Sequence, residues 1–406
     1  MDEPDKTTGM DKLERLSGVL LVALTLSMWV ESVDAQSTLQ SVVDQIERNN
    51  QNIAVEQLEV AADQLSYRTG NTPEDLRIGY DFLKGGLGSG DQTEIIVAQA
   101  FDFPTVYAKR KKLADARVST SDQLLASKVN SIRLQATKVC LRLIYERKRQ
   151  KGLMRKREAT ENILRGFEER LVEGASTKLD VGKSKLQLIG LERELAEART
   201  KELALLAELQ QLNGGKEITF ADTVYPKWGS MSSDTLKAKW EQSDPVHMLL
   251  TKQNEVAEQE IALSKAMWLP KLEAGFRHVS GFGQLFNGVH TGISLPIWER
   301  RNTVKAKKAE QQAMVLNAEM YSTTKTLELN RLLQEQTVLK EMIDEYDKVL
   351  SEVRNLELLQ AALELGRINT TEYFIEVNTY HEAIEARLTT ELQYQEVQAS
   401  INRYGR

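Results

Sequence analysis

The stretch Gly174-Ala175-Ser176-Thr177-Lys178-Leu179-Asp180 decides the fold, because a counterpart follows 192 residues later (366 − 174) at Gly366-Arg367-Ile368-Asn369-Thr370-Thr371-Glu372. The same offset relates Phe101-Asp102-Phe103-Pro104 to Ile293-Ser294-Leu295-Pro296. In each half, therefore, 70 residues separate a proline from a glycine (174 − 104 and 366 − 296). A fixed spacing of this kind indicates an internal duplication, so we expect the two halves to fold alike.

The seven prolines of this 406-residue chain are placed so that long helices are possible. None lies between Pro104 and Pro226, and none follows Pro296. Because proline is the strongest helix breaker, each of these stretches can hold long helices. We expect Pro73, Pro104, Pro270 and Pro296 to mark the four junctions between helices and strands.

The proline-free stretches carry apolar residues at alternating spacings of four and three. This heptad pattern predicts the buried seams of coiled coils. Each heptad helix then meets a glycine, Gly174 or Gly366, which suits a C-cap, and the Ser, Thr or Asn residues that follow suit the next N-cap. Two long helical hairpins are therefore expected. The seam residues are Leu125, Val129, Ile132, Ala136, Val139 and Leu143, then Leu188, Leu191, Leu195, Ala198, Leu205, Leu209 and Leu212, and in the second half Leu329, Leu332, Gln336, Leu339, Ile343, Tyr346, Leu350 and Val353.

Two glycine-rich windows alternate apolar with polar or small residues, which is typical of strands. In the first window Ile78, Tyr80 and Phe82 hold the apolar positions. We expect a β-hairpin over residues 74–103, and a second one over 271–295, where the alternation is weaker.

These strands approach the roughly 9–11 residues that span a bilayer. Four strands cannot close a barrel, and an open edge in lipid would leave backbone groups without hydrogen bonds. If the hairpins span a membrane, several chains must share one barrel. The alternative is a small four-stranded sheet that caps a soluble helical protein.

The N-terminal region resembles a secretion signal. The apolar run at residues 16–30 is shorter than the about 20 residues that a spanning helix needs, but it fits a signal core. Since Val33-Asp34-Ala35 offers a small-residue cleavage site, we expect residues 1–35 to be a signal peptide that is removed on export. The start of translation stays open between Met1 and Met10.

The duplication divides the rest of the chain into three parts. The first repeat covers residues 36–212, an equatorial connector rich in Gly, Asp and Ser covers 213–244, and the second repeat covers 245–406. Each repeat is expected to contain a leading helix (41–66 and 246–266), a β-hairpin, and a long helical hairpin with its turn at 174–180 or 366–372.

Composition excludes several classes of protein. With 28% charged residues and a mean hydropathy of −0.40, the chain cannot be a bundle of membrane-spanning helices. A net charge of −6 argues against general binding of nucleic acid, and the single cysteine, Cys140, excludes an intrachain disulfide. We find no phosphate-binding glycine loop, no nucleophile motif and no His-Glu zinc motif, so we expect neither enzyme activity nor a cofactor.

Two histidines raise the question of a metal site. His278 and His290 lie symmetrically about Gln284 and could face each other across the second hairpin. Two neutral imidazoles make a weak ligand set, so we expect no bound metal.

In these features the chain resembles the bacterial outer-membrane efflux protein family, to which TolC belongs. The resemblance covers the chain from about residue 37 to its end. The resemblance rests on the duplicated order of elements, the motifs Trp268-Leu269-Pro270-Lys271-Leu272 and Leu295-Pro296-Ile297-Trp298, and the twin turns at Gly174 and Gly366.

The resemblance implies a mainly α-helical protein with membrane β-strands. Three protomers would each give four strands to one twelve-stranded outer-membrane barrel, and their helices would continue as a hollow tunnel into the periplasm. It also implies contact with outer-membrane lipid, a periplasmic adaptor (membrane fusion) protein as partner, and an inner-membrane pump, of the resistance-nodulation-division type. The motifs and the short length look closest to the heavy-metal cation branch.

By the family's plan, the two glycine turns lie at the periplasmic tip, where the tunnel narrows and the adaptor docks. The residues that match the tip pattern are Gly174, Ser176, Thr177 and Leu179 in the first turn, and Gly366, Asn369, Thr370 and Tyr373 in the second.

Carboxylates at this tip would form rings in a trimer and favour cations electrostatically. The candidates are Asp180, Glu364 and Glu372. The alternative is ordinary helix-end charge, since acidic residues near a helix start are stabilised by the dipole. Arg367, beside Gly366, would partly neutralise such a ring.

The function expected on these grounds is a passive exit duct for metal cations or small toxic compounds, in the outer membrane of a Gram-negative bacterium and extending into the periplasm. One alternative is a structural or adhesive coiled-coil protein of the envelope, which predicts heptads without membrane strands. Another is the outer-membrane duct of a type I protein secretion system.

Overall fold

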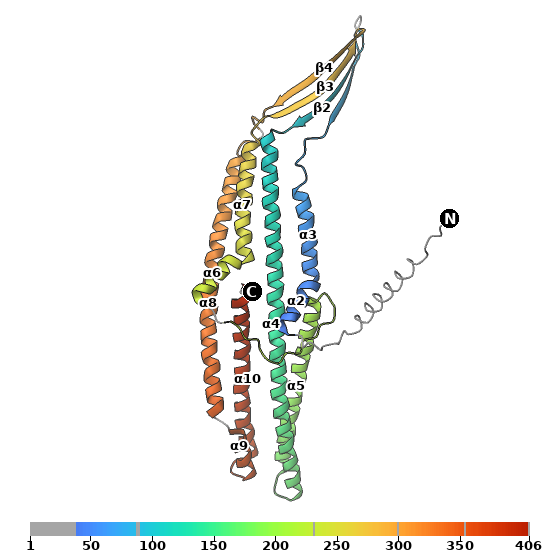
Figure 1. The fold of residues 1–406 in the computed structure, drawn as a ribbon. Coiled ribbons are helices and arrows are strands. Elements are labelled where there is room, and N and C mark those ends of the chain that lie inside the picture. Colours follow the sequence, from blue (N-terminus) through green and yellow to red (C-terminus); the bar gives the residue numbers. More distant parts are fainter. Residues whose placement is uncertain (1–37, 87–89, 230–231, 299, 353–354, 405–406) are drawn as a thin grey trace, which may run out of the picture.

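The computed structural model describes residues 38–86, 90–229, 232–298, 300–352 and 355–404 (Figure 1). The expected signal peptide, residues 1–35, lies outside the described residues. Figure 1 shows an elongated molecule. The β-sheet lies at one end of the long helices, and the turns that join α4 to α5 and α9 to α10 lie at the other end. Among the helices described, none is both long enough and apolar enough to cross a membrane.

The first repeat begins with two helices, α2 (Leu39–Asn49) and α3 (Gln51–Tyr67). The single helix expected over residues 41–66 is therefore wrong. The helix breaks at Asn50, whose backbone is extended and whose side chain caps α3 by accepting a 3.1 Å hydrogen bond from the amide of Ile53. The same side chain donates to the carbonyl of Leu212 (2.7 Å), so a tertiary contact stabilises the break.

Long helices follow in both repeats. In the first, α4 (Pro104–Val172) has 69 residues, which corresponds to about 100 Å, and α5 (Lys178–Leu212) returns beside it. Pro104 is the first residue of α4, where its fixed φ and missing N–H cost nothing. The helices of the second repeat are α7 (Pro245–Ala266), α8 (Thr303–Glu352), α9 (Asn355–Glu364) and α10 (Thr370–Ile401), and the short η1 (Asn402–Tyr404) follows them.

The four strands form one antiparallel sheet in the order β1-β2-β3-β4. Their bounds are β1 (Arg77–Leu83), β2 (Gln92–Phe101), β3 (Lys271–Gly281) and β4 (Gln284–Ser294). Pairing of β2 with β3 joins the hairpins of the two repeats into a single surface. The expectation of a mainly helical protein with four antiparallel strands is confirmed for one protomer.

The predicted heptad seams account for most of the helical core. On α4 and α5 the fully or nearly fully buried seam residues are Ile132, Ala136, Val139, Leu143, Leu191, Leu195, Ala198, Leu209 and Leu212. On α8, Leu329, Leu332, Leu339 and Ile343 are buried, whereas Tyr346 and Leu350 stay half-buried. Tyr346 and Leu350 line an open groove of about 320 Å³ with Ala383 of α10. The seam between α8 and α10 is therefore less tightly packed toward the tip.

The connector between the repeats packs on the middle of the long helices. Phe220 and Tyr225 enter the core of α4 and α5, and the indole of Trp228 donates a 2.6 Å hydrogen bond to Gln395 of α10. The connector ends in α6 (Ser233–Ser243), which contacts α7, α8 and η1.

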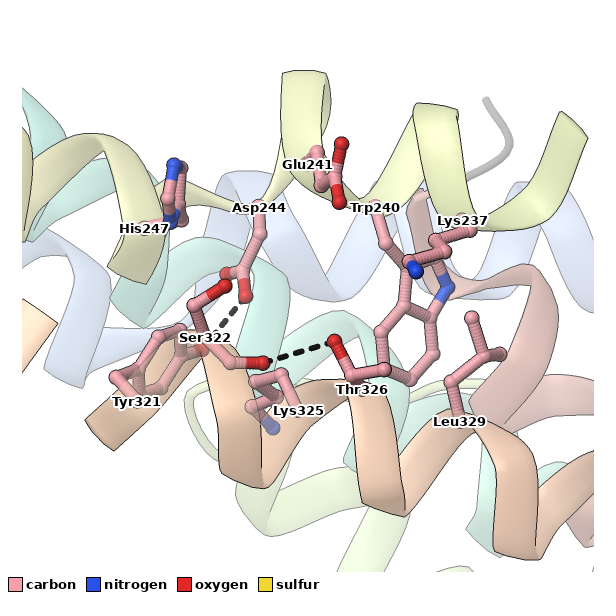
Figure 2. Close-up of a pocket in the computed structure, with 10 residues that line it drawn as sticks. All are labelled: Lys237, Trp240, Glu241, Asp244, His247, Tyr321, Ser322, Lys325, Thr326 and Leu329. Atoms are coloured by element: carbon pink, nitrogen blue, oxygen red, sulfur yellow. Dashed lines mark hydrogen bonds between the residues drawn. The ribbon is translucent and has the colours of Figure 1, made fainter. Parts of the chain in front are cut away.

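Figure 2 shows the small pocket where α6 and α7 meet α8. Asp244 is only 2% exposed, caps α7 through the amide of Val246, and accepts a 2.6 Å hydrogen bond from the hydroxyl of Tyr321. The cavity volume is about 30 Å³, room for no more than one or two water molecules. We therefore interpret these residues as structural contacts that hold the end of the connector against α8.

Candidate functional site

The sheet has one exposed apolar face. Paired residues of an antiparallel sheet lie on the same face, and the register aligns Ile78 with Val97, Val97 with Phe276, and Phe276 with Val289. Val289 is 83% exposed and Ile78 70%. A contiguous apolar surface of this kind marks contact with a membrane or a partner.

The opposite face carries charge. Arg277 pairs with Glu94 across the strands (2.6 Å), and Arg77 pairs with Glu273 (3.1 Å). The imidazole of His290 lies 3.7 Å from the same Glu273 carboxylate. An apolar outside and a polar inside are the two faces of a transmembrane barrel.

The possibility that His278 and His290 face each other is wrong. The hairpin turn is Phe282-Gly283, and both residues have positive φ, as a two-residue type I′ turn requires. The centre of the hairpin therefore lies before Gln284, which places the histidines on opposite faces. His278 bonds instead to Asn287 (2.6 Å). In the described part of the chain, no three His, Cys, Asp or Glu side chains are grouped to hold a metal ion.

The four prolines expected at junctions lie between helix and strand. Pro104 begins α4 after the two residues that follow β2, and Pro270 directly precedes β3. Pro73 lies between α3 and β1, and Pro296 lies between β4 and the start of α8.

The first turn at the far end joins α4 to α5. Gly174 has φ +77°, and the amide of Ala175 donates to the carbonyl of Arg170 (2.8 Å), which forms a Schellman C-cap. Thr177 then caps α5 in a capping box with Asp180. Ser176 is half-buried and Leu179 is 64% exposed.

The second turn repeats these contacts. Gly366 has φ +67°, and the amide of Arg367 donates to the carbonyl of Ala362 (2.8 Å). Asn369 caps α10 in a capping box with Glu372. Positions with 192-residue spacing thus perform the same task, which explains why the repeat is readable in the sequence.

The two turns pack against each other. The hydroxyl of Thr370 donates to Asp180 Oδ1 (2.6 Å), and Lys183 donates to the hydroxyl of Thr371. Beneath them, a shared apolar cluster joins the helices from both repeats. Its buried members are Phe167, Val181, Leu363, Tyr373, Phe374 and Val377. Sequence reasoning missed this link, because residues 190 positions apart carry no local signal of contact.

The three candidate gate carboxylates differ in their surroundings. Hydrogen bonds from Thr177 and then Thr370 lower the pKa of Asp180, so its charge is held in place. Glu372 accepts a 2.9 Å bond from the amide of Asn369 and is exposed. Glu364 is exposed and accepts a 3.1 Å bond from Gln360.

A polar cavity of about 370 Å³ lies between α4, α5 and α10, above the tip. Lys156, Glu194 and His381 line it, together with Gly152 and Gly190, beside which a methyl group would meet no atom within 4 Å. Burial, and then the charge of Lys156, lowers the pKa of His381 to about 4. No sequence motif predicts this cavity, since the residues that line it come from three helices.

No protein-family model and no curated protein sequence matches this chain. Solved structures do match. The chain superimposes on CusC, described in a study of transmembrane channel formation, with a TM-score of 0.76 at 15% identity, covering 91% of this chain and 92% of that one. For the CmeC outer membrane channel of Campylobacter jejuni the TM-score is 0.75 at 14% identity, covering 90% and 85%. The chain has the TolC-like fold of outer-membrane channels.

A third structure with the TolC-like fold is the open state of the Neisseria gonorrhoeae MtrE outer membrane channel. Its TM-score is 0.71 at 15% identity, covering 90% of this chain and 88% of that one. The resemblance expected from the duplicated motifs is confirmed at the level of the fold. CmeC and MtrE are described as outer membrane channels.

Proposed function

We propose that the chain is the outer-membrane duct of a tripartite efflux system in a Gram-negative bacterium, a passive exit for metal cations or small toxic compounds. The observation that carries the proposal is the sheet, which has an exposed apolar face, an ion-paired face, and a position at the end of helices about 100 Å long. A membrane barrel continued by a periplasmic tunnel uses all three features.

The unpaired edges of the sheet support a homotrimer. Among the described residues of one protomer, β1 and β4 each pair with a strand on one side only. In lipid, every unpaired backbone group costs several kcal/mol, so β4 of one protomer must pair with β1 of the next. Three copies close a twelve-stranded barrel, and the ion pairs then line its interior.

The paired turns at the other end support a role in docking and gating. Leu179 and Asn369 are exposed there and available to a periplasmic adaptor, whereas Thr370 and Tyr373 are buried and hold the two turns together. Energy would come from an inner-membrane pump of the resistance-nodulation-division type, to which the adaptor connects. Opening would then separate the two hairpins, a two-state change of packed elements.

Carboxylates at the tip support selection of cations at this entrance. Glu364 and Glu372 are exposed, and threefold symmetry would repeat each of them around the opening. The carboxylate of Asp180 accepts hydrogen bonds from Thr177 in the first turn and Thr370 in the second. Its charge would therefore attract cations while its hydrogen bonds hold the two turns together.

An adhesive or structural coiled-coil protein would need no apolar sheet, and the exposed face of β1–β4 therefore argues against it. Fractionation and reconstitution test the proposal. We expect recovery in the outer membrane, a heat-modifiable trimer in detergent, and ion conductance in planar bilayers. Recovery as a soluble periplasmic monomer without conductance would contradict it, and loss of one exported polypeptide on gene deletion, with unchanged metal and drug tolerance, would indicate protein secretion instead.

A further inference from the structure

Of the exposed basic residues at the junction between the sheet and the long helices, we call five the basic belt. Lys111 and Lys112 lie in the first three turns of α4, Arg301 lies between β4 and α8, and Lys305 and Lys308 lie in the first two turns of α8. Among the residues that the structure describes, none of the five has an ion-pair partner.

Farther along the long helices some basic residues are paired, as Arg147 is with Glu202 (2.8 Å), whereas others, such as Lys151 and Arg199, have no ion-pair partner among the described residues. The belt therefore differs from them in its place beside the sheet. At the junction itself, the acidic side chain of Asp102 is engaged by Arg110 (2.6 Å). Similarly, Lys307 engages both Glu260 (2.9 Å) and Glu310 (2.7 Å). Two exposed carboxylates, Asp75 and Asp115, also lie near this level, and the five basic residues outnumber them, so the balance of these charges is positive.

Exposed aromatic and aliphatic residues lie at the same level. Leu295, Ile297 and Trp298, between β4 and Arg301, are 61%, 58% and 83% exposed. Trp268 is 43% exposed and follows α7, which packs against both α4 and α8 and thus ends beside their starts (Figure 1). Tryptophan is enriched where a membrane meets water, because its ring is apolar and its N–H is polar.

The order along the molecule is thus an apolar strand surface, exposed tryptophans, and then unpaired cations. At 1.5 Å rise per residue, Lys112 lies about 12 Å beyond the start of α4 and Lys308 about 8 Å beyond the start of α8. The headgroup region extends roughly 5–7 Å beyond the hydrocarbon core, and long basic side chains reach back toward an interface. The belt therefore lies within reach of lipid phosphates.

We propose that the basic belt binds the phosphate groups of anionic phospholipids in the leaflet of the outer membrane that faces the periplasm. The inference rests on the proposed insertion of the sheet into that membrane. It assigns the belt a lipid partner because charge complementarity and exposed tryptophans occur together, whereas an acidic protein partner would not require the tryptophans. Such binding would fix the depth of the barrel and orient the tunnel along the membrane normal.

The test compares brominated lipids as quenchers of tryptophan fluorescence in the trimer without the expected signal peptide, reconstituted into vesicles of phosphatidylcholine with increasing phosphatidylglycerol. Trp29 belongs to that signal peptide, Trp228 is hydrogen-bonded in the helical core and Trp240 is buried, so quenching by lipid reports on Trp268 and Trp298. We expect brominated phosphatidylglycerol to bind several-fold more tightly than brominated phosphatidylcholine at low salt, with the preference reduced at high salt.

The variant carries K111Q, K112Q, R301Q, K305Q and K308Q, and its preference should fall to about one. The control removes five exposed basic residues of α4 and α5 that lie farther from the sheet and should keep the preference. Its substitutions are K151Q, R155Q, R165Q, R199Q and K201Q.

Equal quenching by both lipids in the wild-type protein would overturn the lipid assignment while leaving the channel proposal intact. Equal loss of preference in the variant and its control would also overturn it, because net charge alone would then explain the effect. Absence of quenching by either lipid would instead show that the sheet is not in the membrane, and the proposed function would fail.

Discussion

The carboxylate of Asp180, at the start of α5, accepts a 2.6 Å hydrogen bond from the hydroxyl of Thr370, at the start of α10. Each residue belongs to the first turn of the helix that returns from a tip, one in each repeat. The same carboxylate accepts a 2.5 Å bond from Thr177, which caps its own helix. The Asp180 side chain thus both caps its own helix and contacts the other repeat.

Removal of this bond should loosen the tip. We expect Thr370→Val to increase the mean conductance of reconstituted trimers, because a hydrogen bond to a charged group contributes about 1.5–3 kcal/mol. The matched control is Thr379→Val on the same helix, whose hydroxyl bonds only to the carbonyl of Ile375. Identical single-channel currents for both variants would show that the bond does not hold the tip closed.

The tip glycines should resist substitution for a backbone reason. Gly174→Ala forces a residue with a Cβ into φ +77°, which should lower the free energy of unfolding by about 1 kcal/mol. Gly166, two turns earlier in α4, has free space beside it as well, and Gly166→Ala should stabilise the helix by about 0.5–1 kcal/mol. The temperature at which the trimer dissociates measures the effect of each variant. Equal shifts of this temperature in the same direction for Gly174→Ala and Gly166→Ala would contradict the assigned turn.

The exposed carboxylates at the tip should influence ion selection. Glu372→Gln keeps an acceptor for the amide of Asn369 while removing the charge, and Glu364→Gln removes a second ring of charge. We expect the double variant to conduct cations over anions less strongly, by a factor of about two or more. Glu319→Gln, exposed in the middle of α8, should change nothing. Reversal potentials in a salt gradient give the ratio, and an unchanged ratio would remove both residues from the gate.

The polar cavity should make the trimer sensitive to acid. Burial and Lys156 lower the pKa of His381 to about 4, below its ordinary 6.5, so its contribution to stability is present above pH 6.5 and is lost as pH falls through 4. Charging His381 adds a cation near Lys156 and Arg149, which the carboxylates of Glu194, Glu382 and Glu385 offset in part.

For this reason His381→Gln should lose less stability than the wild type between pH 7 and pH 4, by about 1–2 kcal/mol after allowance for solvent screening. Melting midpoints at several pH values check this. Parallel pH profiles for the variant and the wild type would show that this histidine does not sense acid.

The sequence predicted the architecture because its determinants are local and occur twice. Gly174 and Gly366 need positive φ, Thr177 and Asn369 begin capping boxes, and heptads fill the seam between α4 and α5. Each of these signals lies within a few residues, so spacing alone made them readable.

Contacts between distant segments were not predictable in this way. The break at Asn50 depends on a hydrogen bond to Leu212, and the link between the tips joins Asp180 to Thr370. The midpoint of the second hairpin was misread, because it lies between Phe282 and Gly283 rather than at Gln284, and His278 therefore pairs with Asn287 instead of His290.

Ile95 and Ile96 are identical neighbours on β2 that occupy opposite faces of the sheet. Ile95 lies in the apolar row with Tyr80, whereas Ile96 pairs with Arg277 on the charged face. Cys140 is fully buried, and burial raises its pKa to about 12, so the native cysteine stays unreactive. Single cysteines at these two positions can therefore be studied without other changes to the chain.

The most direct measurement is the current through Ile95→Cys and Ile96→Cys trimers during addition of a charged, water-soluble thiol reagent. We predict that the reagent reduces the current of Ile96→Cys, whose thiol lines the barrel, and leaves Ile95→Cys unmodified in lipid. Modification of Ile95→Cys from water, or no effect at Ile96→Cys, would contradict a membrane barrel with the ion-paired face inside.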